Sequence, residues 1–480
     1  MSDRLQRAGT GIVAAGVGEV RVDLVVAGAG AAGLACAIAA HDSGASVAVL
    51  DKYPMPQGNT VLSSASVPAA GTRFQRAAGI EDSAERFEAD LRRRAGPIDN
   101  EALIGVLARV SAPLVEWLAD TVGIAMDVIT EYRHVGHSVP RLHAPTPRRG
   151  QVLLQGLQDA AERRDIPVLF ENRVTALQWD GERVCGVEVL GGTASAHRID
   201  AGAVVLATNG FAANAAMRGR YCPETLGFEY AGAPGSQGEA IEWGVALGAR
   251  LDNIGAYQAH ASYAVPHGVL ATWTLVEKGG IVVDRNGRRF GDESLGYSGF
   301  AAASAAAGQP QFVIYDARIR ELSAAGQPEF AELVAHGGAI EAPDVAALAT
   351  RIGVDPAALA QSLAQAGGAA PDPFGRVEHG LAPLEPPLCA TRVTTAILHT
   401  QGGLAVDASA RVLRADRSVI PGLYAAGGAA AGISGRAGPG GYSSGNGLLA
   451  ALGLGWIAGR ALAASLGSPR ASYLREAGSA

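Results

Sequence analysis

Residues 22–51 read VDLVVAGAGAAGLACAIAAHDSGASVAVLD, and this stretch decides the fold. The apolar run Val22–Ala27 predicts a buried parallel strand. The segment Leu34–His41 predicts a helix, and a second apolar run, Ala45–Leu50, predicts another strand. A buried strand, a helix and a buried strand in this order form a βαβ unit, which indicates an α/β fold with a parallel sheet.

Three glycines and one acidic residue in this βαβ unit indicate a ligand-binding site. Gly28, Gly30 and Gly33 follow the first strand, and Asp51 ends the second. A G-x-G-x-x-G turn with an acid about 20 residues further on is the fingerprint of a dinucleotide site. We expect Gly28 to allow the tight turn, Gly30 to admit a pyrophosphate at the helix N-terminus, and Gly33 to allow close packing of helix on strand. Asp51 can accept hydrogen bonds from a ribose. The alternative is a glycine-rich turn that binds nothing.

Composition narrows the class of protein. The chain has 480 residues, of which 48% are apolar and 18% charged, enough for two or three domains with large cores. A net charge of −7 without any block of Lys or Arg argues against nucleic-acid binding. Four cysteines without metal spacing suggest a reduced, cytoplasmic protein. The longest apolar stretch, Gly447–Gly459, is too short to span a bilayer, so we expect a buried helix and no integral membrane segment.

The remaining pattern suggests that the nucleotide-binding domain is interrupted. Helical periodicity and short strand-like runs continue to a strand at Ala203–Thr208. From about residue 255 to residue 298 the chain reads as loops rich in His, Tyr and Gly, and alanine-rich helices follow. The early pattern returns at Ile397, with another glycine turn at Gly427 and a helix opening at Gly445. The sequence therefore predicts a capping domain inserted within the first domain, which resumes after the cap.

Several separated segments resemble one flavoprotein family, that of fumarate reductases, succinate dehydrogenase flavoprotein subunits and 3-ketosteroid dehydrogenases. The matching segments are GAGAAG (28–33), GNTVLSSAS (58–66), VVLATNGF (204–211), QAH (258–260), DRNGRRFGDES (284–294), DPFGR (372–376), LHTQGG (398–403), VIPGLYAAGG (419–428) and GYSSGNGLL (441–449). The resemblance implies FAD rather than NAD. It also implies a doubly wound, Rossmann-like FAD-binding domain (1–254 and 397–480), interrupted by an α+β capping domain (255–396), with the active site between cap and flavin.

The resemblance assigns cofactor contacts to individual positions of this sequence. Besides the residues of the first turn it implies contacts from further segments along the chain. The last of these is a helix whose N-terminus is aimed at the flavin, where it stabilises negative charge. These positions are Lys52, Gly58, Asn59, Thr60, Ser64, Val174, Thr208, Asn209, Gly210, Gly427, Gly428, Asn446 and Leu448. The histidine segment that bonds FAD covalently in some relatives has no match, and Gln57 precedes Gly58. We therefore expect noncovalent FAD.

The substrate side departs from the fumarate reductase pattern at two positions. Those enzymes clamp a dicarboxylate with arginines and histidines and protonate it with an arginine. In this sequence Tyr297 stands where the proton-donating arginine is expected, and Tyr442 stands where the second clamp arginine is expected. Guanidinium groups bind carboxylates bidentately, whereas phenols cannot neutralise a dianion. A phenol can donate a hydrogen bond to a ketone, or transfer a proton if a neighbour lowers its pKa from about 10.

Tyrosines in these two places resemble the 3-ketosteroid dehydrogenases. The spacing of Tyr442 and Ser444 resembles the Tyr-x-Ser of the Δ4-(5α) branch, and Tyr297 resembles the other tyrosine of that branch. His399 and His260 match the substrate-side histidines of fumarate reductases. For each of these side chains the alternative is ordinary packing in the core. Arg289 is more easily explained as an ion-pairing residue of the cap than as a substrate ligand.

These residues lead to three hypotheses. The first is an FAD-dependent oxidoreductase acting on CH–CH bonds next to a carbonyl, with hydride transfer at flavin N5 and proton transfer by a tyrosine. The second is the same chemistry on an unsaturated carboxylate, for which Arg392 and Arg436 could supply the positive charge. The third is a flavin-binding electron-transfer protein without turnover of its own. The first two require a small-molecule substrate and an electron donor or acceptor, whose identity the sequence does not give.

Overall fold

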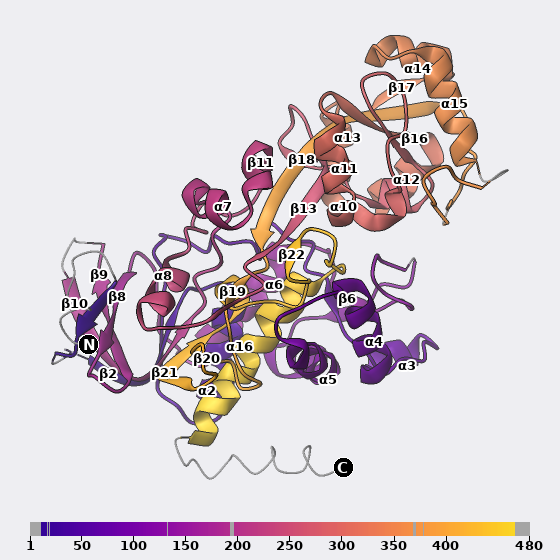
Figure 1. The fold of residues 1–480 in the computed structure, drawn as a ribbon. Helices are drawn as coiled ribbons and strands as arrows, with labels where there is room; N and C mark the ends of the chain where they lie inside the picture. The colour runs from indigo at the N-terminus through magenta and orange to yellow at the C-terminus, as the bar shows by residue number, and fades with distance from the viewer. Residues whose placement is uncertain are drawn as a thin grey trace. The chain divides into compact units, whose positions relative to one another are not determined.

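The computed structural model describes residues 11–16, 18, 20–131, 133–192, 196–367, 371–377 and 379–465 (Figure 1). The chain forms two compact units, each with its own set of elements. The first consists of Met1–Cys222, Gly232–Ala256 and His399–Ala480, and the second of Pro223–Ala231 and Tyr257–Leu398. Strands β13 (Gly255–Ala264) and β18 (Leu388–Thr400) carry the chain across the boundary between them.

Among the described residues, the first unit is built on a nine-stranded mixed sheet, in which strand β2 (Val20–Ala27) has a parallel neighbour on each side. Strand β3 (Val47–Leu50) pairs with one edge of β2, and β10 (Ala196–Leu206) pairs with the other. On the far side of β10 lies β21 (Val419–Ala425), also parallel. In the register Ala27 faces Leu206 and Leu206 faces Ala425. The three strands therefore end level with one another, and the loops that follow them start at the same edge of the sheet, as in nucleotide-binding α/β folds.

Strand β10 is longer than the predicted strand Ala203–Thr208 because its two halves have different neighbours. Its first half pairs antiparallel with β9 (Val184–Leu190), which in turn pairs with β8 (Arg173–Trp179). Its second half pairs with β21. The first half carries His197, Arg198 and Asp200, so it lacks the continuous apolar run that marks a strand covered on both faces.

Helix α2 (Ala31–Asp42) is enclosed on two sides and is buried along most of its length. Helix α16 (Asn446–Ser465), yellow in Figure 1, packs against it. The two helices approach so closely that a Cβ atom on Gly455 would lie 2.1 Å from the Ala32 carbonyl oxygen, and one on Gly459 would lie 2.3 Å from the Cys36 carbonyl oxygen. The predicted apolar stretch 447–459 is thus a helix packed in the core.

One apolar segment of the described chain is long enough to cross a membrane by length and composition alone. It is Glu101–Val122, formed by α5 (Glu101–Trp117) and the π-helical turn η1 (Leu118–Val122). Half of its most apolar window is buried inside the protein, and α5 packs against α4 (Ala84–Ala95) and α16. Core helices of globular proteins share this length and composition, so the segment is weak evidence for a membrane span.

The remaining elements of the first unit complete its edges and connections. The helices are α3 (Arg73–Ala77), α6 (Gly150–Glu162), α7 (Ala215–Tyr221), α8 (Glu239–Ala246) and the 3-10 turn η4 (Gly427–Ala429). The strands are β1 (Ile12–Ala14), β4 (Val67–Pro68), β5 (Met126–Val128), β6 (Leu142–Pro145), β7 (Val168–Leu169), β12 (Leu251–Asp252), β19 (Gly403–Leu404), β20 (Arg411–Leu413) and β22 (Ala437–Gly438).

The second unit is an α+β body around a sheet in the order β14-β13-β18-β16-β15. The loops expected over residues 255–298 are wrong, because this segment contains the ten-residue strand β13 and the shorter β15. Within β13 the polar residues Gln258, His260 and Ser262 alternate with apolar ones, as expected of a strand, although nearly every residue is buried on both faces. The other elements are β11 (Glu229–Tyr230), β14 (Val269–Leu270), β15 (Ile281–Val283), β16 (Gln311–Asp316), β17 (Ile340–Ala342), α9 (Thr274–Glu277), α10 (Gly296–Gly299), α11 (Ala301–Ala307), α12 (Ala317–Gly326), α13 (Pro328–Ala335), α14 (Val345–Ile352), α15 (Pro356–Ala366), η2 (Pro223–Gly227) and η3 (Glu293–Leu295).

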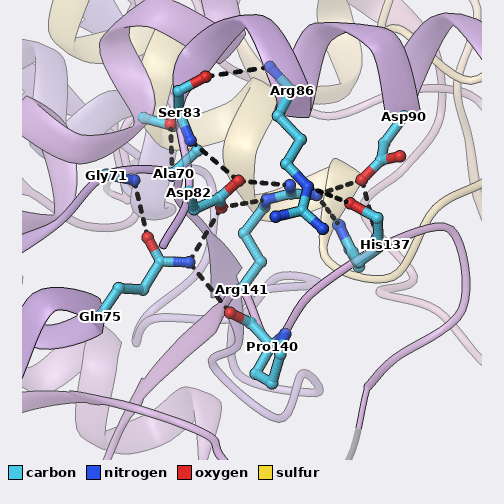
Figure 2. Close-up of polar contacts among 12 residues, drawn as sticks. Ala70, Gly71, Gln75, Asp82, Ser83, Arg86, Asp90, His137, Pro140 and Arg141 are labelled. Carbon is cyan, nitrogen blue, oxygen red and sulfur yellow. Dashed lines mark hydrogen bonds and ion pairs between the residues drawn. The ribbon is translucent and has the colours of Figure 1, made fainter. Parts of the chain in front are cut away.

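A buried ion network ties α4 to the loop that precedes β6 (Figure 2). Arg141 is fully buried and holds Asp82 with two parallel hydrogen bonds of 2.7 and 2.8 Å. It also donates to Asp90 at 2.8 Å. Burial raises the pKa of Asp90, but hydrogen bonds from Ser138 and Arg141 outweigh it and hold that pKa well below its ordinary value. Asp90 is therefore charged, and it pairs with Arg93 at 2.6 Å as well as with Arg141, whereas Asp82 has its ion pair with Arg141.

The network gives a prediction for stability. Arg141→Met should lower the free energy of unfolding by about 3–5 kcal/mol, since it leaves the buried Asp82 without its cation and Asp90 with Arg93 alone. Arg73 is the matched control, because it holds Asp120 in the same two-bond geometry, at 2.6 Å for each bond, but on the exposed surface. Arg73→Met should cost far less than Arg141→Met, because water and salt screen an exposed ion pair. Equal losses for the two variants in chemical denaturation would contradict the prediction.

Candidate active site

The glycine turn after β2 has the shape that the sequence predicts. Gly28 has a φ of +111°, and a Cβ atom there would lie 2.4 Å from the Ala207 carbonyl oxygen. A Cβ atom on Gly33 would lie 1.9 Å from the Gly28 carbonyl oxygen, so helix and turn are in backbone contact. A Cβ atom on Gly30 would meet only the Thr60 hydroxyl, at 3.8 Å. Two of these glycines therefore allow protein packing, while Gly30 leaves space in front of the N-terminus of α2.

Asp51 and its neighbours border this turn. The Asp51 carboxylate accepts the backbone N–H of Ala29 at 2.8 Å and that of Tyr53 at 3.0 Å. Lys52 forms an ion pair of 2.6 Å with Glu239, so its charge is already matched. The Asp51 carbonyl accepts the N–H of Asn172 at 2.8 Å, which places the segment before Val174 beside the acid.

The turns that follow β10 and β21 lie against each other. A Cβ atom on Gly428 would lie 2.4 Å from the Asn209 side-chain oxygen, and one on Gly210 would lie 2.1 Å from the Thr400 hydroxyl. Asn209 has a φ of +69°, a left-handed conformation that asparagine tolerates better than most residues. A Cβ atom on Gly427 would lie 3.1 Å from the Ala32 Cβ atom, so the third turn reaches the helix of the first.

Three of the residues expected to contact FAD carry buried polar atoms without a hydrogen-bond partner. They are the side-chain nitrogen of Asn59, the hydroxyl of Thr208 and the side-chain oxygen of Asn446. Unpaired polar atoms are costly to bury, and each such atom calls for a partner. A bound cofactor rich in hydrogen-bonding groups would supply them. The orphaned atoms and the space at Gly30 therefore fit FAD.

The other predicted cofactor residues differ in what the structure shows of them. Thr60 accepts the N–H of Ala31 at 3.2 Å, which ties its loop to the start of α2. Ser64 is exposed, and its hydroxyl lies 3.1 Å from that of Ser66. Leu448 lies in the first turn of α16 and is half-buried. A Cβ atom on Gly58 would meet no atom within 4 Å.

On the substrate side of the first unit, Tyr442 and His399 meet at the start of α16. The backbone N–H of Gly447 donates to the Tyr442 phenol oxygen at 3.3 Å. The rings of His399 and Tyr442 are edge-to-face, with centroids 6.0 Å apart. Desolvation lowers the pKa of His399 to about 4, so its ring is neutral at pH 7. Gln401 donates to Nδ1 of His399 at 3.0 Å, a contact that the sequence did not predict.

The loop that carries Tyr442 and Ser444 is held by the buried ion network. Nε2 of His137 lies 2.9 Å from the Ser444 carbonyl oxygen, and Nδ1 lies 3.3 Å from a guanidinium nitrogen of Arg141. Arginine has no acceptor, so Nδ1 accepts and the hydrogen sits on Nε2, pointing at Ser444. Arg94 donates to the Tyr442 carbonyl oxygen at 3.2 Å. His137 and Arg94 were not predicted, because their partners lie 307 and 348 residues away in the sequence.

In the second unit, His260 and Tyr297 form a stacked pair. Their ring centroids are 4.7 Å apart with an angle of 15° between the planes. His260 belongs to β13 and Tyr297 to α10, and the N–H of Ala259 donates to the Ser298 hydroxyl at 3.2 Å, which holds α10 against the strand. Desolvation lowers the pKa of His260 to about 3, so this ring is also neutral.

The arginines considered as substrate ligands are engaged elsewhere or exposed. Arg289 is buried and pairs with Glu293 and Asp372, at 2.9 and 2.6 Å, which confirms its ion-pairing role. Arg436 is largely exposed and pairs with Asp99 at 2.6 Å. Arg392 lies exposed on β18. Among the described residues, no group of three or more His, Cys, Asp or Glu side chains could hold a metal ion.

Comparison with known proteins agrees with this geometry. Residues 23–448 match the family model described as FAD binding domain. The chain belongs to this family. It is an FAD-dependent oxidoreductase, related to the fumarate reductases, with the α/β FAD-binding fold and its capping domain.

Two relatives illustrate the relationship in sequence. The chain is 33% identical to the NADH:fumarate oxidoreductase of Klebsiella pneumoniae over 421 residues, covering 86% of this chain but 45% of that protein. It is 32% identical to the fumarate reductase (cytochrome) of Shewanella frigidimarina, covering 86% of this chain and 73% of that one. The chain thus spans less than half of the Klebsiella relative.

Two solved structures illustrate the relationship in fold. An open conformation of a flavocytochrome c3 fumarate reductase superposes with a TM-score of 0.78 at 27% identity, over 97% of this chain and 81% of the other. The 3-ketosteroid-Δ4-(5α)-dehydrogenase of Rhodococcus jostii RHA1, in complex with 4-androstene-3,17-dione, superposes with a TM-score of 0.72 at 25% identity, over 93% and 98%.

The two kinds of glycine in the first turn give a prediction. Gly30→Ala should fold with unchanged stability of the apoprotein but lose FAD, because the new methyl group points into the space in front of α2. Gly33→Ala should destabilise the apoprotein itself, since its methyl group would collide with backbone. The measurements are the flavin-to-protein absorbance ratio and thermal unfolding of both apoproteins. A Gly30→Ala protein that retains full FAD would contradict the assignment.

Proposed function

We propose that the protein forms or reduces a C=C bond next to a ketone, with Tyr442 and Tyr297 handling the carbonyl oxygen and the proton. When bound, FAD supplies the site that accepts or gives the hydride. The observation that carries the proposal is the pair of phenols in place of guanidinium groups. Phenols can hydrogen-bond a neutral carbonyl, whereas a dicarboxylate calls for fixed positive charge.

The surroundings of Tyr442 suit this role. Its phenol oxygen accepts a backbone N–H in the first turn of α16, where the helix dipole favours negative charge. The neutral ring of His399 lies beside it and can donate a further hydrogen bond. The loop is fixed at the Tyr442 and Ser444 carbonyls by Arg94 and His137. Tyr442 is therefore held in place while its oxygen is kept in a polar setting.

The second unit contributes its own pair. Tyr297 stacks on His260, so its ring orientation is set by a neutral neighbour rather than by an ion pair. We propose that both tyrosines act on the same substrate, as the ketosteroid dehydrogenase resemblance implies. The similarity in fold to an enzyme solved with a 3-ketosteroid supports a ring ketone as the substrate class.

An unsaturated carboxylate remains the second candidate, because two relatives are named for fumarate. The ion pair between Arg436 and Asp99 weakens it, since that cation is already neutralised. The FAD is proposed to be noncovalent. The compartment is proposed to be cytoplasmic, in keeping with four cysteines that form no disulfide. The electron partner is proposed only as a separate donor or acceptor.

The state of the cofactor can be checked directly. Precipitating the purified protein with acid should release a yellow supernatant with the absorbance of FAD, because the sequence matches no covalent attachment segment. Colour retained in the pellet would show a covalent bond and refute this part of the proposal.

The tyrosine mechanism predicts that neutral ketones outperform fumarate. Under anaerobic conditions, saturated 3-ketosteroids or cyclohexanones should bleach the flavin, or enones should reoxidise it, faster than succinate and fumarate do. Tyr442→Phe should lower the rate by about 10²–10³, as for loss of one catalytic donor, and Tyr297→Phe by a similar factor. FAD content should not change.

Tyr315→Phe is the matched control. It removes the same hydroxyl from a buried tyrosine of β16, which is bonded to Thr391 at 2.8 Å and has no place in the proposed chemistry. Its rate should stay near that of the wild type. Full activity of both Tyr442→Phe and Tyr297→Phe would end the tyrosine mechanism, and faster turnover of fumarate than of any ketone would favour the carboxylate candidate.

A further inference from the structure

A chain of hydrogen bonds leads from the start of α16 to His399 within the first unit. The side-chain nitrogen of Asn446 donates to the Ser434 hydroxyl oxygen at 3.3 Å. The Ser434 hydroxyl donates to the side-chain oxygen of Gln401 at 2.9 Å. The side-chain nitrogen of Gln401 then donates to Nδ1 of His399 at 3.0 Å. Asn446, Ser434 and Gln401 are almost completely buried, at 1%, 1% and 5% exposure, so water does not compete for these bonds.

The donor and acceptor groups of these side chains require all the hydrogen bonds of the chain to point in the same direction. An amide has one accepting and one donating end, and a hydroxyl has a single hydrogen. If the Gln401 amide were rotated by about 180°, exchanging its oxygen and nitrogen, the Ser434 hydrogen would have to point the other way and the Asn446 amide would have to rotate too. In the direction that the structure shows, Nδ1 of His399 is an acceptor. The competing acceptor at Nδ1, the Thr400 carbonyl oxygen, is farther away at 3.3 Å.

We infer that Gln401 and Ser434 are positioning residues that hold His399 as the neutral tautomer with its hydrogen on Nε2. The depressed pKa of the buried ring agrees with the neutral state. Nε2 lies at the start of α16, since a Cβ atom on Gly447 would be 3.0 Å from it. Gly447 also donates to the phenol oxygen of Tyr442, so the hydrogen on Nε2 is presented beside that tyrosine.

The inference deepens the proposed function and, in its meaning for the substrate, rests on it. A neutral His399 with its hydrogen on Nε2 is a hydrogen-bond donor, suited to a carbonyl oxygen of the substrate, and proton transfer is left to the tyrosines. At the other end of the chain the side-chain oxygen of Asn446 is buried without a partner. A donor on the bound cofactor would fix this amide, and through the chain it would fix the tautomer.

The tautomer can be measured without any substrate. The holoenzyme is labelled with ¹⁵N-histidine, and the His399 signals are identified by their loss in the His399→Gln spectrum. Long-range couplings separate the two ring nitrogens, because Nε2 couples to both carbon-bound ring protons. In the wild type the unprotonated nitrogen should be Nδ1. In Gln401→Glu the new carboxylate accepts from Nδ1, so the unprotonated nitrogen should move to Nε2.

Two further variants distinguish an effect of this hydrogen-bond chain from a general effect on folding. Ser434→Ala breaks the chain between Gln401 and Asn446 and should give a mixture of both tautomers. Gln178→Met is the control, because it removes a buried amide from β8 in the same unit and should leave the His399 signals unchanged. A wild-type ring protonated on Nδ1, or a Gln401→Glu protein with the wild-type pattern, would overturn the inference. Failure of the proposed function would appear only in the turnover assays and would not alter these spectra.

Discussion

Close backbone contact around helix α2 is the constraint on which the rest of the structure depends. The turn after β2 touches the helix at Gly33, and α16 touches its other side at Gly455 and Gly459. No side chain other than hydrogen fits at these contacts. They bring the first and last thirds of the chain together, with the turns that follow β2, β10 and β21 at one edge of the sheet. Gly30, between the closely packed Gly28 and Gly33, is the position of the turn that faces open space.

The cofactor half could be predicted from the sequence because its requirements are local. A tight turn needs glycine, a ribose needs an acid at the end of the next strand, and both are visible within the stretch 22–51. Strand content was harder to predict where Gly, His and Tyr residues are also typical of loops, as in β13, or where polar residues interrupt the apolar run, as in the first half of β10. The assignment of individual cofactor contacts remains a prediction that the orphaned atoms of Asn59, Thr208 and Asn446 support.

The substrate half could be predicted only in part. Tyr297 and Tyr442 are recognisable because they replace arginines in segments that otherwise match a family. The residues that hold these tyrosines in place do not stand out in the sequence in this way. Gln401 reads as an ordinary polar residue after His399, and His137 reads as one of several histidines in a loop. Their roles depend on hydrogen-bond partners that the fold brings close. The spacing of residues along the sequence does not predict which residues these partners are.

The order in which the ribosome synthesises the chain delays completion of the sheet in the first unit. The second half of β10 pairs with β2 on one side, but its other neighbour, β21, is synthesised only after the whole second unit. Until then the apolar edge Val204–Leu206 is open, and α2 lacks the cover of α16. Open strand edges and uncovered apolar helices are the surfaces on which nascent chains aggregate. Folding on the ribosome therefore leaves this part of the sheet incomplete for as long as the inserted unit takes to be translated.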